Sequence, residues 1–318
     1  MGLFNLFQKK RPAAPPQTPR PVVMSRAAGH LPPHPSPQAE NNFLIVILDS
    51  CRYDTFMQAA PKIITKLGPV EKRYSYASWT APSHYNLLTG LLPHTTPPNV
   101  YASEYYKEDF FNFNKRLGAK GIEFAKMVPA LWFPGLLRNV LGYRTHARVS
   151  LPVLNERTGV NRDFDSFKLM DKHNDMRSML PTMTFGTDRP SFYLLNVGET
   201  HYPYAKPDED SSMWPRISGV NGVFKNLSQS VDEQGNLIKD TTQFFDQDRL
   251  DQLRARQIDT VRYLDGVFEA LYDMVPKNTH IVVTADHGEL FGELGYFGHG
   301  PIMHEKVFEV PYLEGKLR

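Results

Sequence analysis

Three short, mainly apolar runs constrain the fold of this 318-residue chain more than any other feature of its sequence. They span residues 43–48, 191–197 and 280–284, and Ile, Leu and Val dominate them. Runs of this length and composition are typical of strands buried on both faces, as in a parallel sheet that helices cover. Apolar residues also recur at three- and four-residue steps over residues 250–271, which predicts an amphipathic helix that ends before Pro276.

The sequence therefore predicts an α/β fold, a three-layer sandwich with a mostly parallel central sheet and helices on both faces. We expect one domain over residues 41–318. Only a short stretch follows Leu313, so we expect any C-terminal subdomain to be reduced or absent.

Polar, titratable residues follow each of the three runs. Asp49 follows the first run, Glu199 and His201 the second, and Asp286 and His287 the third. In open α/β sheets, sites are built at the carboxyl ends of the strands. Two carboxylates and an imidazole that converge there suit a divalent cation such as Zn²⁺, Mn²⁺, Mg²⁺ or Ca²⁺. Each Asp taken alone also fits a helix cap or a turn.

A further segment, residues 78–90, places a hydroxyl at the start of a predicted helix. Thr80 stands just before Pro82, a residue that fits the first helical turn, and Gly90 ends the segment. Free backbone N–H groups and the helix dipole lower the cost of negative charge at such a position. A hydroxyl bound there to a divalent cation can ionise and attack phosphorus or sulfur. The alternative from local sequence is that Thr80 only caps the helix.

Residues 1–40 differ in composition from the rest of the chain. They hold nine of the 26 prolines, five Lys or Arg and a single acid, Glu40. Proline at this density removes backbone donors and fixes φ, which predicts a disordered, solvated basic tail. The alternative is a weak peripheral membrane contact, made by the apolar residues among the first seven and the Lys-Lys-Arg that follows them.

Composition excludes or disfavours several classes of protein. No apolar run reaches roughly 18 residues, so no transmembrane helix is expected. The N-terminus also lacks the pattern of a secretory signal, and we expect a cytoplasmic protein. A net charge of +2 gives no reason to expect a nucleic-acid partner, and the lone Cys51 excludes an intramolecular disulfide.

Two stretches are open to more than one interpretation. Residues 205–245 are polar and irregular, and a loop of this length is usually functional or disordered. Residues 128–141 are apolar but are interrupted by two prolines. They suit core packing, or alternatively a contact with substrate or membrane.

Several segments, taken in order, resemble the alkaline phosphatase superfamily on its sulfatase-like branch. The resemblance covers roughly residues 42–314. It depends on the combination of several matching segments, because the Asp-His-Gly-Glu motif alone would be weak evidence for the family. GYRT at 142–145 and RDFDSF at 162–167 also fit the family's middle section. The main segments are LIVILDSCRYD at 44–54, TAPSHYNLLTG at 80–90, ETHYPY at 199–204 and VVTADHGELFGELGYFGHG at 282–300 with HEKVFEVPYL at 304–313.

The resemblance implies a role for each matched residue. It makes Thr80 the nucleophile and also a metal ligand. It makes His201 and His299 groups that contact the transferred group or protonate the leaving oxygen, a task that suits an imidazole pKa near about 6.5. The implied metal ligands are Asp49, Thr80, Asp286 and His287.

Departures from the sulfatase pattern narrow the implied chemistry. Thr80 stands where sulfatases carry the Cys or Ser that becomes formylglycine, and threonine cannot form that aldehyde hydrate. Threonine nucleophiles occur in the phosphodiesterases and the phosphoglycerol or phosphoethanolamine transferases of the superfamily. His84 replaces the Arg of the motif, and Ser50 replaces a second Asp. The remaining set resembles the one-metal phosphonate monoester hydrolases.

A nitrogen ligand favours Zn²⁺ or Mn²⁺ over Mg²⁺ or Ca²⁺. We expect one ion. A second ion would have to draw its ligands from Glu199, His201, His299 and His304.

The expected function is that of a metal-dependent hydrolase or transferase acting on phosphate mono- or diesters or phosphonate esters. The expected substrate is a small molecule or a phosphate ester linked to a lipid or glycan. One alternative is a sulfatase-type sulfoester hydrolase. The other is a pseudoenzyme that keeps the fold and binds a partner through its Pro-rich tail.

Overall fold

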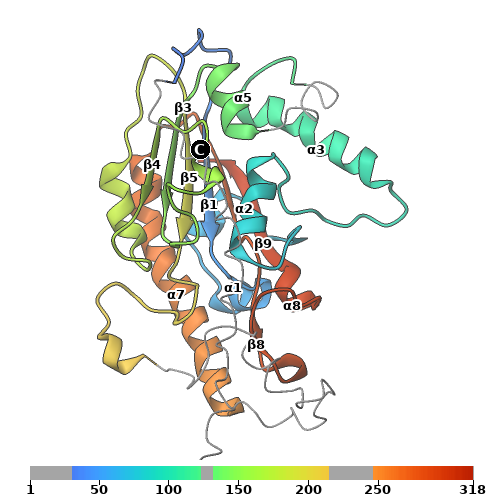
Figure 1. Cartoon of the computed structure of the whole chain (residues 1–318), viewed down its shortest axis with the longest axis vertical. Coiled ribbons are helices and arrows are strands. Elements are labelled where there is room, and N and C mark those ends of the chain that lie inside the picture. The colour runs from blue at the N-terminus through green and yellow to red at the C-terminus, as the bar shows by residue number, and fades with distance from the viewer. Residues whose placement is uncertain (1–30, 123–131, 215–245, 318) are drawn as a thin grey trace, which may run out of the picture. The chain divides into compact units, whose positions relative to one another are not determined.

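The computed structural model describes residues 31–122, 132–214 and 246–317. These residues build a seven-stranded sheet in the order β2-β9-β6-β1-β5-β3-β4, with helices on both sides (Figure 1). The three apolar runs form its centre. Strand β1 (Asn42–Leu48) lies between β5 (Ser191–Val197) and β6 (Thr279–Thr284), all three are parallel, and every residue in them is buried.

Four further strands complete the two sides of the sheet. Strands β3 (Arg144–Val149) and β4 (Ser166–Leu169) continue the parallel arrangement beyond β5. Beyond β6 lies β9 (Glu309–Lys316), which pairs antiparallel both with β6 and with the edge strand β2 (Glu71–Tyr74). The sheet is therefore mostly parallel, as predicted.

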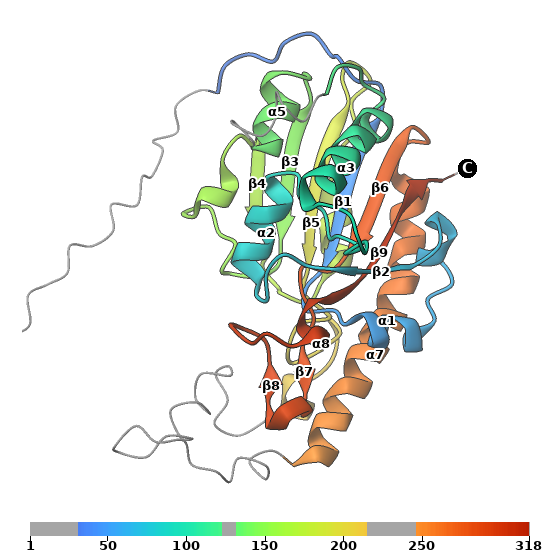
Figure 2. The same ribbon diagram turned by 90° about the vertical axis from the view of Figure 1, so that its right-hand side faces the viewer.

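Helices cover the two faces of the sheet because the side chains of its central strand alternate between them. In β1, Leu44, Val46 and Leu48 enter one apolar cluster, and Phe43, Ile45 and Ile47 enter the other. The predicted three-layer sandwich is confirmed, and Figure 2 shows the layers from the side. The first face carries α1 (Tyr53–Ala59), η1 (Ile64–Leu67), η4 (Met176–Thr182) and α7 (Gln247–Met274); the second carries α2 (Thr80–Leu88), α3 (Ala102–Leu117) and α5 (Phe133–Asn139).

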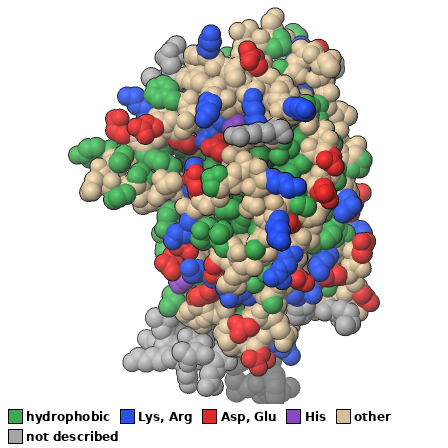
Figure 3. Space-filling model, turned by 180° about the vertical axis from the view of Figure 1, so that it is seen from behind, with side chains coloured by type: hydrophobic (Ala, Val, Ile, Leu, Met, Phe, Trp, Pro, Cys, Tyr) green, Lys and Arg blue, Asp and Glu red, His purple; other side chains and the backbone are tan. Residues whose placement is uncertain are grey.

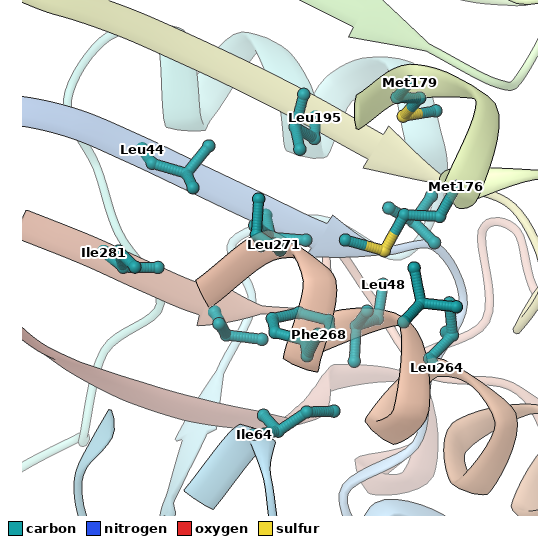
Figure 4. Packing of buried hydrophobic residues seen from close by; sticks show 14 of the residues in the cluster. Leu44, Leu48, Ile64, Met176, Met179, Leu195, Leu264, Phe268, Leu271 and Ile281 are labelled. Carbon is teal, nitrogen blue, oxygen red and sulfur yellow. The ribbon is translucent and has the colours of Figure 1, made fainter. Parts of the chain in front are cut away.

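Helix α7 is the predicted amphipathic helix. Its Leu264, Phe268 and Leu271 are fully buried and pack over the central strands, as Figure 4 shows. The helix begins before the predicted range because the Asp246 side chain accepts a hydrogen bond from the backbone N–H of Asp248. It ends at Met274, ahead of Pro276, as expected.

Short elements lie beyond the carboxyl ends of the central strands, at the lower end in Figure 2. They include a hairpin of β7 (Leu290–Phe291) and β8 (Phe297–Gly298), which packs on Tyr204, Leu250 and Leu253 in a small apolar cluster. The other short elements of the described chain are η3 (Gly159–Asn161), η5 (Ser211–Met213), η6 (Glu293–Gly295) and α8 (Glu305–Phe308).

The two ambiguous stretches fall partly outside the described residues. Within 128–141, residues 132–141 are described, and Phe133, Leu137 and Leu141 are buried in the second apolar cluster. This supports core packing. Of the predicted loop at 205–245, residues 215–245 lie outside the described residues.

The predicted tail is described from residue 31 onward. His34 Nε2 lies 2.9 Å from Asp165, and the Gln38 N–H donates to the Leu141 carbonyl at 3.0 Å. The division at residue 40 stays a prediction, as does the cytoplasmic location. In the described parts of the chain, no helix combines the length and apolar character needed to cross a bilayer. On the face drawn in Figure 3, basic and acidic side chains are interspersed.

Candidate active site

The residues predicted to bind metal come together at the carboxyl ends of β1 and β6. The possible ligand atoms of Asp49, Asp286 and His287 lie within 4.8 Å of one another, and all three residues are buried. The Thr80 hydroxyl lies 3.3 Å from His287 Nε2 and 3.5 Å from Asp49 Oδ1. The four side chains therefore surround one point.

Parallel pairing explains why two distant carboxylates meet there. Ile47 of β1 is paired with Thr284 of β6, so Asp49 and Asp286, each two residues further on, leave the sheet side by side. Thr80 comes from the other layer, where it is the first residue of α2. Pro82 lies in the first turn of this helix, as predicted, where its missing N–H costs no helical hydrogen bond.

Neighbouring polar groups hold Asp49 in place. The Asn196 side chain donates to its Oδ2 at 2.7 Å, and the Ser50 hydroxyl donates to its Oδ1 at 3.2 Å. Burial opposes ionisation, but the imidazoles of His201, His287 and His84 and the hydrogen bond from Asn196 lower the pKa of Asp49. Sequence analysis did not single out Asn196. The signal was its place as a polar residue within an otherwise apolar strand.

Asp286 provides an observation that tests whether a cation fits. Its Oδ1 accepts from the backbone N–H groups of Ser50 and His287, at 3.1 and 3.0 Å. Its Oδ2 is buried and has no hydrogen-bond partner among the described residues. Burial and the neighbouring Asp49 raise the pKa of Asp286 well above its usual range. A buried oxygen without a partner, beside a second carboxylate, is the arrangement that a divalent cation satisfies.

The hydrogen bonding of His287 prepares it as a neutral ligand. Its Nδ1 lies 2.9 Å from the Gly288 carbonyl oxygen, which can only accept, so Nδ1 carries the proton. The lone pair of Nε2 then faces Thr80 and the carboxylates. Burial, together with the nearby His299, lowers the pKa of His287 well below its usual value. Both effects favour the neutral imidazole that metal binding needs.

His299 and His201 lie next to this group. The His299 ring is 4.3 Å from the His287 ring and 5.5 Å from the His201 ring, centroid to centroid. His201 Nδ1 donates to the Tyr202 carbonyl at 2.8 Å, and His299 Nδ1 lies 2.8 Å from Glu289 Oε1. Burial opposes protonation of His299, yet the hydrogen bond and charge of Glu289 raise the pKa of His299.

Three other residues singled out in the sequence, His84, Glu199 and His304, are not among the close ligand atoms. His84 is buried; its Nδ1 donates to the Thr80 carbonyl at 2.8 Å, and its Nε2 lies 3.3 Å from the Asn196 amide. Glu199 accepts from the Met176 N–H at 2.7 Å. His304 caps α8 by accepting from the Lys306 N–H. Neither Glu199 nor His304 belongs to the group of close ligand atoms.

The family match places the chain in the alkaline phosphatase-like superfamily, whose sulfatase branch the fold also resembles. The family model described as Sulfatase matches residues 41–313, and the chain belongs to that family. This confirms the resemblance seen in the sequence. No curated protein matches the chain.

Solved structures show a similar fold at low sequence identity. The 2-O GAG sulfatase BT1596 is 14% identical, with a TM-score of 0.51, over 87% of this chain and 64% of that protein. The phosphonate monoester hydrolase of Agrobacterium radiobacter is 14% identical, with a TM-score of 0.48, over 87% and 68%. The C-terminal periplasmic domain of the phosphoethanolamine transferase EptC from Campylobacter jejuni is 11% identical, with a TM-score of 0.46, over 87% and 80%.

Proposed function

We propose that the chain is a metal-dependent enzyme that hydrolyses or transfers phosphate or phosphonate ester groups through Thr80. The observation that carries the proposal is the position of the Thr80 hydroxyl, at the first turn of α2 and within 3.5 Å of two of the predicted metal ligands. A hydroxyl that served only as a cap would accept from a nearby helix N–H. Trp79, not Thr80, occupies the cap position of α2.

Asp49, Thr80, Asp286 and His287 would hold one ion, with Zn²⁺ or Mn²⁺ favoured by the mixed nitrogen and oxygen donors. When bound, such a cation lowers the pKa of a coordinated hydroxyl and polarises the bonds of a phosphoryl group. The proposed substrates are small-molecule, lipid-linked or glycan-linked phosphate esters.

The residues of the chain perform the remaining steps. Thr80 gives up its hydroxyl proton to solvent, and its Oγ1 forms a bond to phosphorus while the ester P–O bond on the opposite side breaks. An imidazole, His201 or His299, gives a proton to the leaving oxygen. Water or an acceptor alcohol then attacks the phospho-threonine and gives its proton to that imidazole, while the bond from phosphorus to Oγ1 breaks and Oγ1 takes back a proton from solvent. The N-terminal N–H groups of α2 stabilise the charge on the phosphoryl oxygens.

The same residue argues against sulfoester hydrolysis through formylglycine. Oxidation of a Cys or Ser side chain yields an aldehyde, but the Cβ of Thr80 already carries a methyl group. A hydrated aldehyde nucleophile therefore cannot form at this position.

The test is elemental analysis of the purified chain, combined with turnover of matched aryl phosphate monoester, diester, phosphonate and sulfate substrates. We expect bound Zn or Mn and turnover of the phosphorus esters. Thr80→Ala should lower kcat by on the order of a thousandfold or more, and Thr80→Ser should retain measurable activity because it keeps the hydroxyl.

Thr89→Ala is the matched control. Its hydroxyl donates to the Asn86 carbonyl at the far end of the same helix, and this change should leave kcat within about twofold. Full activity in Thr80→Ala would reject the covalent mechanism. A metal-free protein that no added Zn²⁺ or Mn²⁺ activates would favour the pseudoenzyme, and turnover of the sulfate alone would favour the sulfatase.

A further inference from the structure

A buried carboxylate outside the metal group connects the two loops that carry the catalytic histidines. Glu289 follows β6, and its side chain is only 2% exposed. One of its oxygens accepts a hydrogen bond from the Tyr204 hydroxyl and the other lies 2.8 Å from His299 Nδ1. Tyr204 belongs to the loop after β5 that also holds His201. Both oxygens of Glu289 are thus committed to these two partners.

The surroundings hold this arrangement rigidly. Tyr204 is fully buried and packs with Phe291 and Phe297 of the β7–β8 hairpin. Its backbone is in the left-handed region, at a φ of 56°, which a bulky residue adopts only when its surroundings require it. The backbone of Glu289 is held as well, since the buried Arg52 donates to its carbonyl oxygen at 3.3 Å.

The two histidines are oriented by different kinds of partner. Nδ1 of His201 donates to a backbone carbonyl, whereas Nδ1 of His299 meets a carboxylate. Both hydrogen bonds are 2.8 Å long, but a charge-assisted hydrogen bond is stronger than a neutral one, so it fixes the His299 ring and its tautomer more firmly. In both histidines Nδ1 is engaged, and Nε2 is the nitrogen left to meet a substrate.

On this basis we propose that Glu289 is a positioning residue that orients His299, and that His299 is the proton donor to the leaving oxygen. The inference rests on the proposed function. As the P–O bond to the leaving group breaks, the proton on Nε2 of His299 passes to the departing oxygen, and the proton on Nδ1 stays hydrogen-bonded to Glu289.

The decisive experiment varies the leaving group in Glu289→Gln, which keeps the shape of the side chain and removes its charge. A 4-nitrophenyl leaving group departs without a proton, whereas an alkyl alcohol needs one. We expect the variant to keep its metal, to stay within about threefold of wild-type kcat on the 4-nitrophenyl ester, and to lose about 10- to 100-fold in kcat on the alkyl ester, with KM within about twofold on both.

Two further variants separate positioning from a general structural effect. Tyr204→Phe keeps the buried ring and removes one hydrogen bond to Glu289, and it should show the same dependence on leaving group to a smaller degree. Glu269→Gln is the control, because it makes the same chemical change at an exposed position of α7. It should show no such dependence. Equal losses on both esters in Glu289→Gln would overturn the inference.

A readout without turnover keeps this inference distinct from the proposed function. In ¹⁵N-labelled protein, the Nδ1 proton of His299 should give a downfield, slowly exchanging signal that Glu289→Ala abolishes and Glu269→Gln retains. Absence of that signal in wild-type protein would contradict the positioning role, whatever the enzyme acts on. A normal signal in a protein that turns over no ester would instead contradict the proposed function.

Discussion

Single residues in this chain depart from ordinary acid–base behaviour where the fold buries them. Asp286 is the clearest example at the site, because it is buried beside the carboxylate of Asp49, and both effects raise its pKa. A cation and a proton are therefore alternative ways of satisfying the same pair of carboxylates. Removing the cation should therefore lower the free energy of unfolding of the whole domain.

Chelation should accordingly lower the stability of the metal-loaded protein. At an ion concentration about 100 times the dissociation constant, the bound state is favoured by about 2.7 kcal/mol, and a chelator removes this contribution. Thermal unfolding of the wild type should show a lower midpoint with chelator present. Asp286→Asn should unfold at the same temperature with and without chelator; a chelator-dependent midpoint in that variant would argue against Asp286 as a ligand.

Burial raises the pKa of Glu199 as it does that of Asp286, although Glu199 does not belong to the group of close ligand atoms. Burial is the main cause that raises its pKa to about 7, and its second carboxylate oxygen has no hydrogen-bond partner among the described residues. Because the folded pKa lies above the unfolded one, this group contributes stability at low pH that is lost as the pH rises from about 4.5 to 7.

Glu199→Gln should remove this dependence on pH. Measured by urea unfolding of metal-free protein, the wild type should lose up to about 3 kcal/mol from this group between pH 4.5 and 8, and the variant should lose correspondingly less. The exposed Glu269 of α7 provides the control, and Glu269→Gln should follow the wild type. Parallel pH profiles for all three proteins would contradict the assignment.

The helices and strands that could be predicted from the sequence are those with a regular pattern of buried apolar residues. The strands β1, β5 and β6 are apolar on both faces, and α7 repeats apolar residues at helical spacing, so composition and periodicity identify them. The edge strand β2 and its neighbour β9 are not apolar throughout, and the two-residue strands of the β7–β8 hairpin are too short for any periodicity. Those strands form because they hydrogen-bond to a neighbouring strand. A local sequence pattern does not show which strands will be neighbours.

Helix α7 allows a test of how much one face of an element contributes. Phe268 is fully buried between the helix and the sheet (Figure 4). Its neighbour Glu269 is exposed. Phe268→Ala should reduce the free energy of unfolding by about 3–5 kcal/mol, and Glu269→Ala should change it by less than about 0.5 kcal/mol. Urea unfolding measures both. Similar effects in the two variants would contradict the packing described for this helix.

Across the whole molecule, the candidate site joins groups that are far apart in the sequence. The gathering of Asp49, Asp286 and His287 was predictable, since parallel strands end at the same edge of a sheet. The contacts of Asn196 with Asp49 and of Glu289 with His299 were not. They depend on loop conformation and side-chain direction, which follow from tertiary packing.

The ligand group also has a consequence for how the chain matures. Its members come from the ends of the first and last central strands and from α2 in one covering layer, so a partly assembled chain lacks a complete set of donors. Binding of the ion would then stabilise only molecules in which the central strands and α2 are in place. Metal binding would therefore distinguish fully folded molecules from collapsed intermediates that lack the complete ligand set.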